Sequence, residues 1–132
     1  MARPRKHDRH KIISAICVAI SQGKLVKDAA KANGLTAGQV REWTAEDPAL
    51  AALYARARED QAHAIAESAL AIADLPAPTS EAVARNRLRV DTRKWLASKI
   101  APRNYGDRVE QVHTGSDGGA IAHTVTVRFV KP

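Results

Sequence analysis

The first 35 residues alternate between apolar segments at helical spacing and short polar stops. Residues 9–21 carry isoleucines three and four positions apart until Gln22-Gly23 interrupts the pattern. Residues 25–32 continue it until Asn33-Gly34, a pair suited to the left-handed backbone at a helix end. The pattern predicts two short helices separated by a tight turn.

Two capping signals then mark the starts of further helices. Thr36 and Gln39 fit the capping box, in which each side chain accepts a hydrogen bond from the other residue's backbone N–H. Asp47-Pro48 places a capping carboxylate before a proline at the first helical position, and an alanine-rich stretch follows. We expect a third short helix up to about residue 47 and a long fourth helix to about residue 74.

The proline-rich segment 75–80 ends the fourth helix, and Thr79 or Ser80 caps a fifth predicted helix over residues 81–100. Two long helices joined so closely form an antiparallel hairpin. A turn-rich segment, residues 102–107, follows the hairpin.

Beyond the hairpin the pattern changes to one typical of strands. Residues 109–113 and 124–130 have strand character, and a glycine-rich loop at 115–119 separates them. An isolated strand pair is marginal in water, and its open edges favour pairing with other chains. We therefore expect short C-terminal β-strands that form a barrel between subunits, because a closed barrel has no edges.

One segment fits the template of a helix-turn-helix. This motif needs a small residue where its helices cross, a glycine in the turn and apolar residues at set offsets. These positions hold Ala30, Gly34, Leu35, Val40 and Trp43. The predicted fold is mainly α, with an N-terminal helix-turn-helix, a central antiparallel helical hairpin for oligomerisation and a C-terminal β-strand barrel shared between subunits.

These elements divide the chain into three domains. Residues 1–47 form a helix-turn-helix DNA-binding domain with a basic N-terminal arm, residues 48–101 a helical-hairpin oligomerisation domain, and residues 102–132 a turn and C-terminal strand segment. Only 4% of the residues are aromatic and many apolar ones are alanine, so the core of a single copy is thin. Composition thus favours self-association.

The charge balance points to a polyanionic partner. The formal net charge is +7 and the pI is about 10.0, which favours nucleic acid. If Val40 and Trp43 are buried, Arg41 and Gln39 face outward, where arginine can read guanine and glutamine can read adenine. The predicted DNA-binding residues are Arg3, Arg5, Lys6, Arg9, Lys24, Lys27, Lys31, Thr36, Gln39 and Arg41. Two other interpretations stay open: a three-helix unit that only packs, and a basic arm that is only solvated.

The predicted hairpin carries a basic ridge, with Arg85, Arg89 and Arg93 four residues apart. This ridge pairs with Glu59, Asp60 and Glu67 of the same or a neighbouring chain, lines a channel for DNA, or forms a solvated face. An apolar stripe that includes Val83, Leu88 and Trp95 is expected to face the preceding helix. We assign Arg85, Arg89, Arg93 and Trp95 to oligomerisation.

Residues 88–108 resemble the small terminase subunit of tailed double-stranded DNA bacteriophages, in the branch with an N-terminal helix-turn-helix. The run 90–96, followed by Pro102, Tyr105, Gly106 and Asp107, carries the resemblance. Trp43, Asp47-Pro48 and residues 54–59 agree with the family pattern, so that the resemblance covers about residues 20–112.

The resemblance implies a homo-oligomeric ring of about eight to ten subunits, with helix-turn-helix domains outside, hairpins in the ring and C-terminal strands as a crown. It implies that such a ring recognises double-stranded viral DNA and delivers it to the large terminase subunit, an ATPase and nuclease that it regulates. The crown strands are the implied contact for the large subunit. The implied location is the cytoplasm of the infected bacterial host, without a membrane partner.

The sequence predicts no chemistry of its own. The loop at 115–119 lacks the lysine and following helix of a phosphate-binding loop. The five histidines are dispersed, and the one cysteine, Cys17, lies among isoleucines as an inert core thiol. We therefore expect no catalytic residues, no metal site and no cofactor. With a single cysteine there is no intrachain disulfide, which fits a reducing compartment.

One alternative from another class remains. A dimeric helix-turn-helix transcription regulator, or a transposase DNA-binding subunit, would share residues 1–47. The long alanine-rich hairpin and the strand segment argue against it, because a dimeric regulator needs neither.

Overall fold

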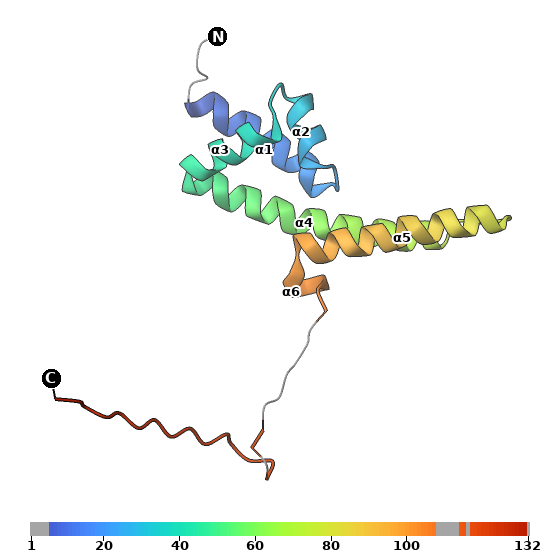
Figure 1. Ribbon diagram of the computed structural model, residues 1–132. Helices are drawn as coiled ribbons and strands as arrows, with labels where there is room; N and C mark the ends of the chain where they lie inside the picture. Colours follow the sequence, from blue (N-terminus) through green and yellow to red (C-terminus); the bar gives the residue numbers. More distant parts are fainter. Residues whose placement is uncertain (1–5, 108–113, 116, 132) are drawn as a thin grey trace.

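The structure, a computed structural model, describes residues 6–107, 114–115 and 117–131 (Figure 1). Six helices form this described part, in the order α1 (Lys6–Ser21), α2 (Val26–Ala32), α3 (Ala37–Glu46), α4 (Pro48–Ala73), α5 (Ser80–Ile100) and α6 (Pro102–Tyr105). The first five helices correspond to those predicted from the sequence. The last is a short helix where the sequence indicated only turns.

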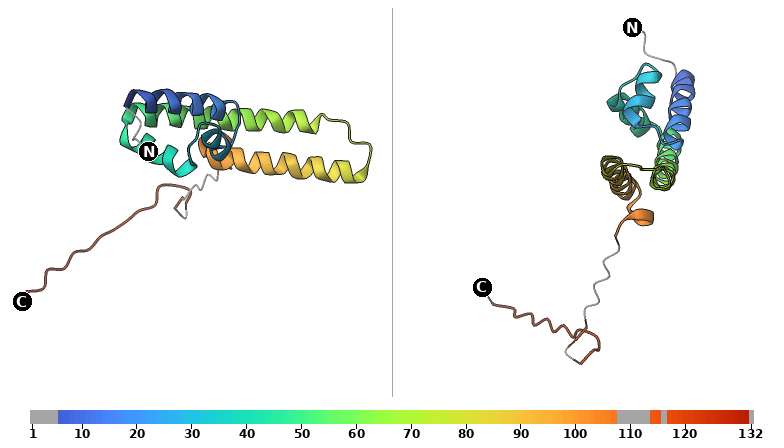
Figure 2. Two further views of the ribbon diagram at one scale, coloured as in Figure 1. Left: turned by 90° about the horizontal axis from the view of Figure 1, so that it is seen from above. Right: turned by 90° about the vertical axis from the view of Figure 1, so that its right-hand side faces the viewer.

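The helices form two layers. In Figure 1, α1, α2 and α3 lie on one side of α4, and α6 lies on the opposite side of the hairpin. Figure 2 shows α4 and α5 side by side along the hairpin, with α1 running along the first half of α4. The hairpin therefore extends well beyond the three N-terminal helices, and its outer half has only α4 and α5.

Local capping explains where the long helices begin. Both hydrogen bonds of the predicted capping box are present, from Gln39 N–H to Thr36 Oγ1 at 3.2 Å and from Thr36 N–H to Gln39 Oε1 at 2.9 Å. Asp47 Oδ1 accepts from the N–H of Ala49 at 3.0 Å. Thr79, not Ser80, caps α5, because its Oγ1 accepts from the N–H of Ala82.

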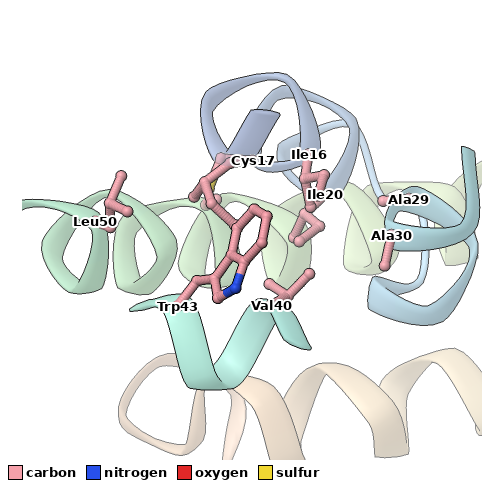
Figure 3. Packing of buried hydrophobic residues seen from close by; sticks show 10 residues of the cluster. Ile16, Cys17, Ile20, Ala29, Ala30, Val40, Trp43 and Leu50 are labelled. Atoms are coloured by element: carbon pink, nitrogen blue, oxygen red, sulfur yellow. The ribbon is translucent and has the colours of Figure 1, made fainter. Parts of the chain in front are cut away.

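The main hydrophobic core joins the N-terminal helices to the hairpin. Figure 3 shows the indole of Trp43 extending from α3 toward α1 and α4, among Ile16, Ile20 and Leu50. Leu50 and Ala57 of α4 belong to this cluster together with residues of α1, α2 and α3. The first half of α4 therefore completes the core of the three preceding helices.

The apolar stripe predicted on α5 differs from the one that packs against α4. Trp95 and Leu88 do not face α4; they are 60% and 67% exposed. Ala97 is buried, and Arg93 is half-buried against α4 instead. The apolar stripe predicted to face α4 mixed residues from two sides of α5, because its members do not keep one three-to-four spacing. Val83 is likewise exposed.

The C-terminal segment has no strand within the residues that the structure describes. Residues 109–113 of the first predicted strand lie outside them, and residues 124–130 are extended and exposed without strand pairing. The loop forms a turn, in which Gly115 N–H donates to the Gly119 carbonyl at 2.7 Å.

No helix in the described ranges is long and apolar enough to cross a membrane.

Candidate nucleic-acid interface

The packing of α3 decides which of its side chains face solvent. Val40 is fully buried and Trp43 is 8% exposed, both against α1 and α4. Ala30 is fully buried on α2, and Gly34 has a φ of +74°, a left-handed conformation that favours glycine. The helix-turn-helix template is thus filled as predicted, and α3 presents its other side outward.

Arg41 lies on that outward side. It is exposed, and it forms no side-chain hydrogen bond or ion pair with any described residue. A guanidinium with all its donors available can form the two parallel hydrogen bonds that guanine accepts in the major groove. Arg41 is therefore the strongest base-reading candidate on α3.

Thr36 and Gln39 are already engaged by their own helix. The Gln39 carbonyl accepts from the Thr36 N–H, and the Thr36 hydroxyl oxygen accepts from the Gln39 N–H. Bidentate reading of adenine needs both the carbonyl and the amide group of a glutamine. Both residues therefore cap the N-terminus of α3. Their side chains are nevertheless exposed there.

Three of the predicted DNA-binding lysines lie on α2 or just before it. Lys24 lies in the turn before α2, and Lys27 and Lys31 lie on α2 one helical turn apart; all three are exposed. Lys6 begins α1, whereas Arg3 and Arg5 lie outside the described residues. Their exposure leaves these lysines available for contacts with phosphates.

Arg9, which the sequence predicted to bind DNA, forms contacts within the module instead. Its guanidinium lies 4.8 Å from the ring centroid of Trp43 and forms an ion pair with Glu46 Oε2 at 2.8 Å. The Arg9 side chain is only 15% exposed. Arg9 thus links α1 to Trp43 and Glu46 in the C-terminal half of α3. Because its guanidinium is engaged in these contacts, we leave Arg9 out of the proposed DNA surface.

Buried Gln61 is a positioning residue that sequence reasoning missed. It is fully buried on α4, donates to the backbone carbonyl of Lys24 at 2.6 Å and accepts from Arg58 at 2.6 Å. These bonds tie the turn before α2 to the hairpin. No local pattern marks Gln61, since its partner lies 37 residues away in the chain.

The basic ridge of α5 is split between two environments. Arg93 donates to the Ser68 hydroxyl at 3.1 Å and to the Arg89 carbonyl at 3.3 Å. Arg85 and Arg89 are exposed, and their side chains form no ion pair with the described residues. The alternative in which this ridge pairs with Glu59, Asp60 and Glu67 of the same chain is therefore not observed.

Charged side chains lie along the exposed sides of both hairpin helices. Exposed acidic residues are spaced seven positions, or two helical turns, apart at Asp60 and Glu67 of α4 and at its C-cap Asp74, and the exposed Arg56 lies one turn before Asp60. On α5, Leu88 and Trp95 are also seven residues apart, and basic residues flank them. These basic residues are Arg85, Arg87, Arg89, Lys94 and Lys99, and the exposed Asp91, between Leu88 and Trp95, lies 4.0 Å from Arg87.

The described residues contain no group of three or more potential metal ligands. Cys17 is buried, and desolvation raises the pKa of its thiol, so the reactive thiolate is disfavoured.

The fold places the chain in the class of helix-turn-helix proteins, here with a long helical hairpin attached. Comparison with protein families gives a match over residues 8–112 to the family described as "Bacteriophage Sf6, terminase small subunit-like". The chain therefore belongs to this family of phage small terminase subunits. Membership decides against the transcription regulator or transposase interpretation.

Solved structures agree with the family match. Crystal structures of three single-residue variants of the terminase small subunit gp1 of the bacterial virus Sf6 are similar to this chain. One has 35% identity and a TM-score of 0.68, covering 96% of this chain and 98% of that chain. The others have 36% and 37% identity and TM-scores of 0.65 and 0.68; they cover 89% and 88% of this chain and 92% and 95% of theirs. The comparison with curated protein sequences found no significant match.

Proposed function

We propose that this chain assembles into a ring of about eight to ten copies that recognises double-stranded viral DNA and delivers it to the large terminase subunit. The ring regulates that subunit, which supplies ATP hydrolysis and DNA cleavage; the chain itself carries no catalytic site. Family membership supports DNA, the large subunit and further copies of the chain as partners. The proposed location is the host cytoplasm.

The DNA-binding part rests on one observation: among the described residues, Arg41 extends without a side-chain partner from the outward side of α3, in a module that also exposes Lys24, Lys27 and Lys31. Arginine reads guanine, and lysines neutralise the flanking phosphates. One module has few base-reading side chains and binds weakly. Several modules on one ring bind DNA more tightly than one, because each further module binds at a high effective concentration once the first has bound.

The oligomeric part rests on exposed side chains of the hairpin that the described chain leaves without an ion pair, Arg85 and Arg89 on α5 and Glu67 on α4. Packing the outer face of α5 on the outer face of α4 of the next copy brings Arg85 and Arg89 toward Glu67. Such a contact joins two different surfaces, and repeated contacts of this kind close into a ring when the rotation permits. The apolar residues of 124–130 then pair between copies as a crown, the proposed contact for the large subunit.

Selection of bound DNA from a random duplex pool tests the recognition proposal, with Arg41→Ala compared against Lys27→Ala. We expect the native chain to enrich a short guanine-containing motif. Arg41→Ala should lose discrimination at one position by about 5- to 150-fold, the equivalent of a bidentate base contact. Lys27→Ala should keep the motif and lower affinity for all sequences, with a salt dependence reduced by about one counterion.

Two results would contradict this assignment. If Arg41→Ala enriches the same motif as the native chain, then Arg41 does not read bases. If the native chain enriches no motif at any salt concentration, then this surface carries only phosphate contacts.

A further inference from the structure

A hollow of about 420 Å³ lies where the turn between α1 and α2 meets the helical hairpin. Gln22, Gly23 and Leu25 form one wall, and residues of α4 and α5 form the others. The hairpin residues of the lining are Ala64, Ile65, Ser68, Thr92, Arg93 and Leu96. The hollow therefore borders both the helix-turn-helix and the hairpin.

The wall formed by the turn is held against α4. The Lys24 carbonyl accepts the 2.6 Å hydrogen bond from buried Gln61. Gly23 has a φ of +97°, and a Cβ there would lie 3.4 Å from the Cβ of Ala64, so the backbone of the turn approaches α4 closely. This wall is thus backbone that the hairpin keeps in place.

Arg93 is the one ionisable residue that lines the hollow, and it is half-buried. Its Nε donates to Ser68 Oγ at 3.1 Å, and one terminal nitrogen donates to the Arg89 carbonyl at 3.3 Å. A guanidinium has five N–H donors, and the described residues accept from none of the other three. A cation with free donors in such a hollow fits an anionic group.

The acidic residues closest in sequence to these walls do not line the hollow. Asp91 lies two positions before Arg93, or about 200° around α5. Glu67 lies about 100° around α4 from its neighbour Ser68, and Asp28 lies on α2 beyond the turn. An incoming group therefore meets the positive charge of Arg93 and no carboxylate of the lining.

The hollow lies close to the part of the module that approaches the DNA backbone. When a helix-turn-helix binds DNA, its second helix enters the major groove and its first helix crosses the backbone. Here the first helix is α2, and its N-cap Leu25 is part of the wall of the hollow. In both views of Figure 2, α3 and α5 lie on one side of the molecule, and α1 and α4 lie on the other. A duplex read by α3 thus passes on the side of α5.

We propose that this hollow receives a backbone phosphate of the duplex that α3 reads, with Arg93 as its charged ligand. The inference rests on the proposed DNA binding and adds a contact from the hairpin to those of the helix-turn-helix. It also assigns Arg93 to DNA, whereas the sequence predicted a role in oligomerisation. Phosphate contacts fix the orientation of a protein on DNA. A contact from α5 thus sets the direction of the duplex relative to the hairpin.

Binding of the full-length chain to one duplex of fixed sequence, measured over a series of salt concentrations, tests this contact. Arg93→Gln removes the charge. Lys94→Gln is the matched control, because it removes one positive charge from the neighbouring exposed position, about 100° around α5. Ser68→Ala keeps the guanidinium and removes its hydrogen bond to α4. Circular dichroism melting and native mass spectrometry check the folding and the assembly of each variant.

A further pair of variants leaves Arg93 and its bond to Ser68 in place. Thr92 is exposed and lines the hollow. Thr92→Glu adds a carboxylate there, and Thr92→Gln is its uncharged control. We expect Thr92→Glu to bind DNA more weakly than Thr92→Gln, with a difference that grows as the salt concentration falls.

We expect Arg93→Gln to reduce the salt dependence of binding as much as Lys27→Ala does, by about one counterion for each module on the duplex. Lys94→Gln and Ser68→Ala should keep the native salt dependence. Ethylation of backbone phosphates should reveal one phosphate whose modification weakens binding of the native chain and of Lys94→Gln, but not of Arg93→Gln. A purely structural role of Arg93 would leave this pattern of sensitive phosphates unchanged.

The opposite results overturn the assignment. If Arg93→Gln keeps the native salt dependence and the same sensitive phosphates, the hollow does not hold a phosphate. If Ser68→Ala reduces the salt dependence equally, Arg93 acts through the packing of α5 on α4. If Arg93→Gln changes the oligomer mass and not the salt dependence, the hollow is a contact between copies. If the native chain binds no DNA, the proposed function fails as well, which distinguishes that failure from a failure at Arg93 alone.

Discussion

At the residue scale, Arg9 is expected to stabilise the fold and not to bind DNA. Arg9→Ala removes the contact with Trp43 and the ion pair with Glu46, so we expect the free energy of unfolding to fall by about 1–2 kcal/mol. Lys11→Ala is the control: Lys11 is exposed two positions further along α1, and the change should be within about 0.5 kcal/mol. Urea unfolding measures both. If Arg9→Ala weakens DNA binding as much as Lys27→Ala does and leaves stability unchanged, then Arg9 contacts DNA.

At the element scale, α6 is a short helix held against α4 by two side-chain contacts. Tyr105 Oη lies 2.6 Å from His63 Nδ1, and Asn104 donates to Glu59 at 3.2 Å. Gly106 is the C-cap of this helix, and a larger residue would not fit there unchanged, since a Cβ would lie 2.5 Å from the Pro102 carbonyl oxygen. Tyr105→Phe keeps the ring but loses the hydroxyl, so amide exchange in residues 103–106 should accelerate about two- to fivefold. Tyr54→Phe should leave that exchange unchanged; equal acceleration in both variants would mean that the hydroxyl does not hold α6.

At the scale of the whole molecule, the proposed C-terminal crown is expected to fix the size of the proposed ring. Val125, Val127 and Phe129 are 85%, 67% and 94% exposed in a single copy, on alternate positions. Replacing all three with serine should broaden the distribution of oligomer masses, because the crown loses its apolar face. Replacing Thr124, Thr126 and Arg128 with serine alters the other face and should keep the native distribution. Native mass spectrometry compares the two, and a crown is ruled out if neither changes the masses.

Sequence alone was sufficient where the physical cause is local. The capping residues Thr36, Asp47 and Thr79 mark helix starts within one or two residues, because a cap and its N–H partner are at most three positions apart. The small residue and the glycine of the helix-turn-helix follow the same logic. Their spacing alone identified the module, and the structure confirms it.

Only the tertiary structure decided which side chains remain available. Arg9 and Arg41 are both arginines of the basic module, but α3 packs so that one lies over Trp43 and the other faces solvent. Gln61 meets the Lys24 carbonyl only because α1 lies along α4, and Trp95 faces outward only because α5 packs on α4 through its opposite side. Such contacts join residues tens of positions apart, and they depend on helix rotation, which spacing along one helix does not determine.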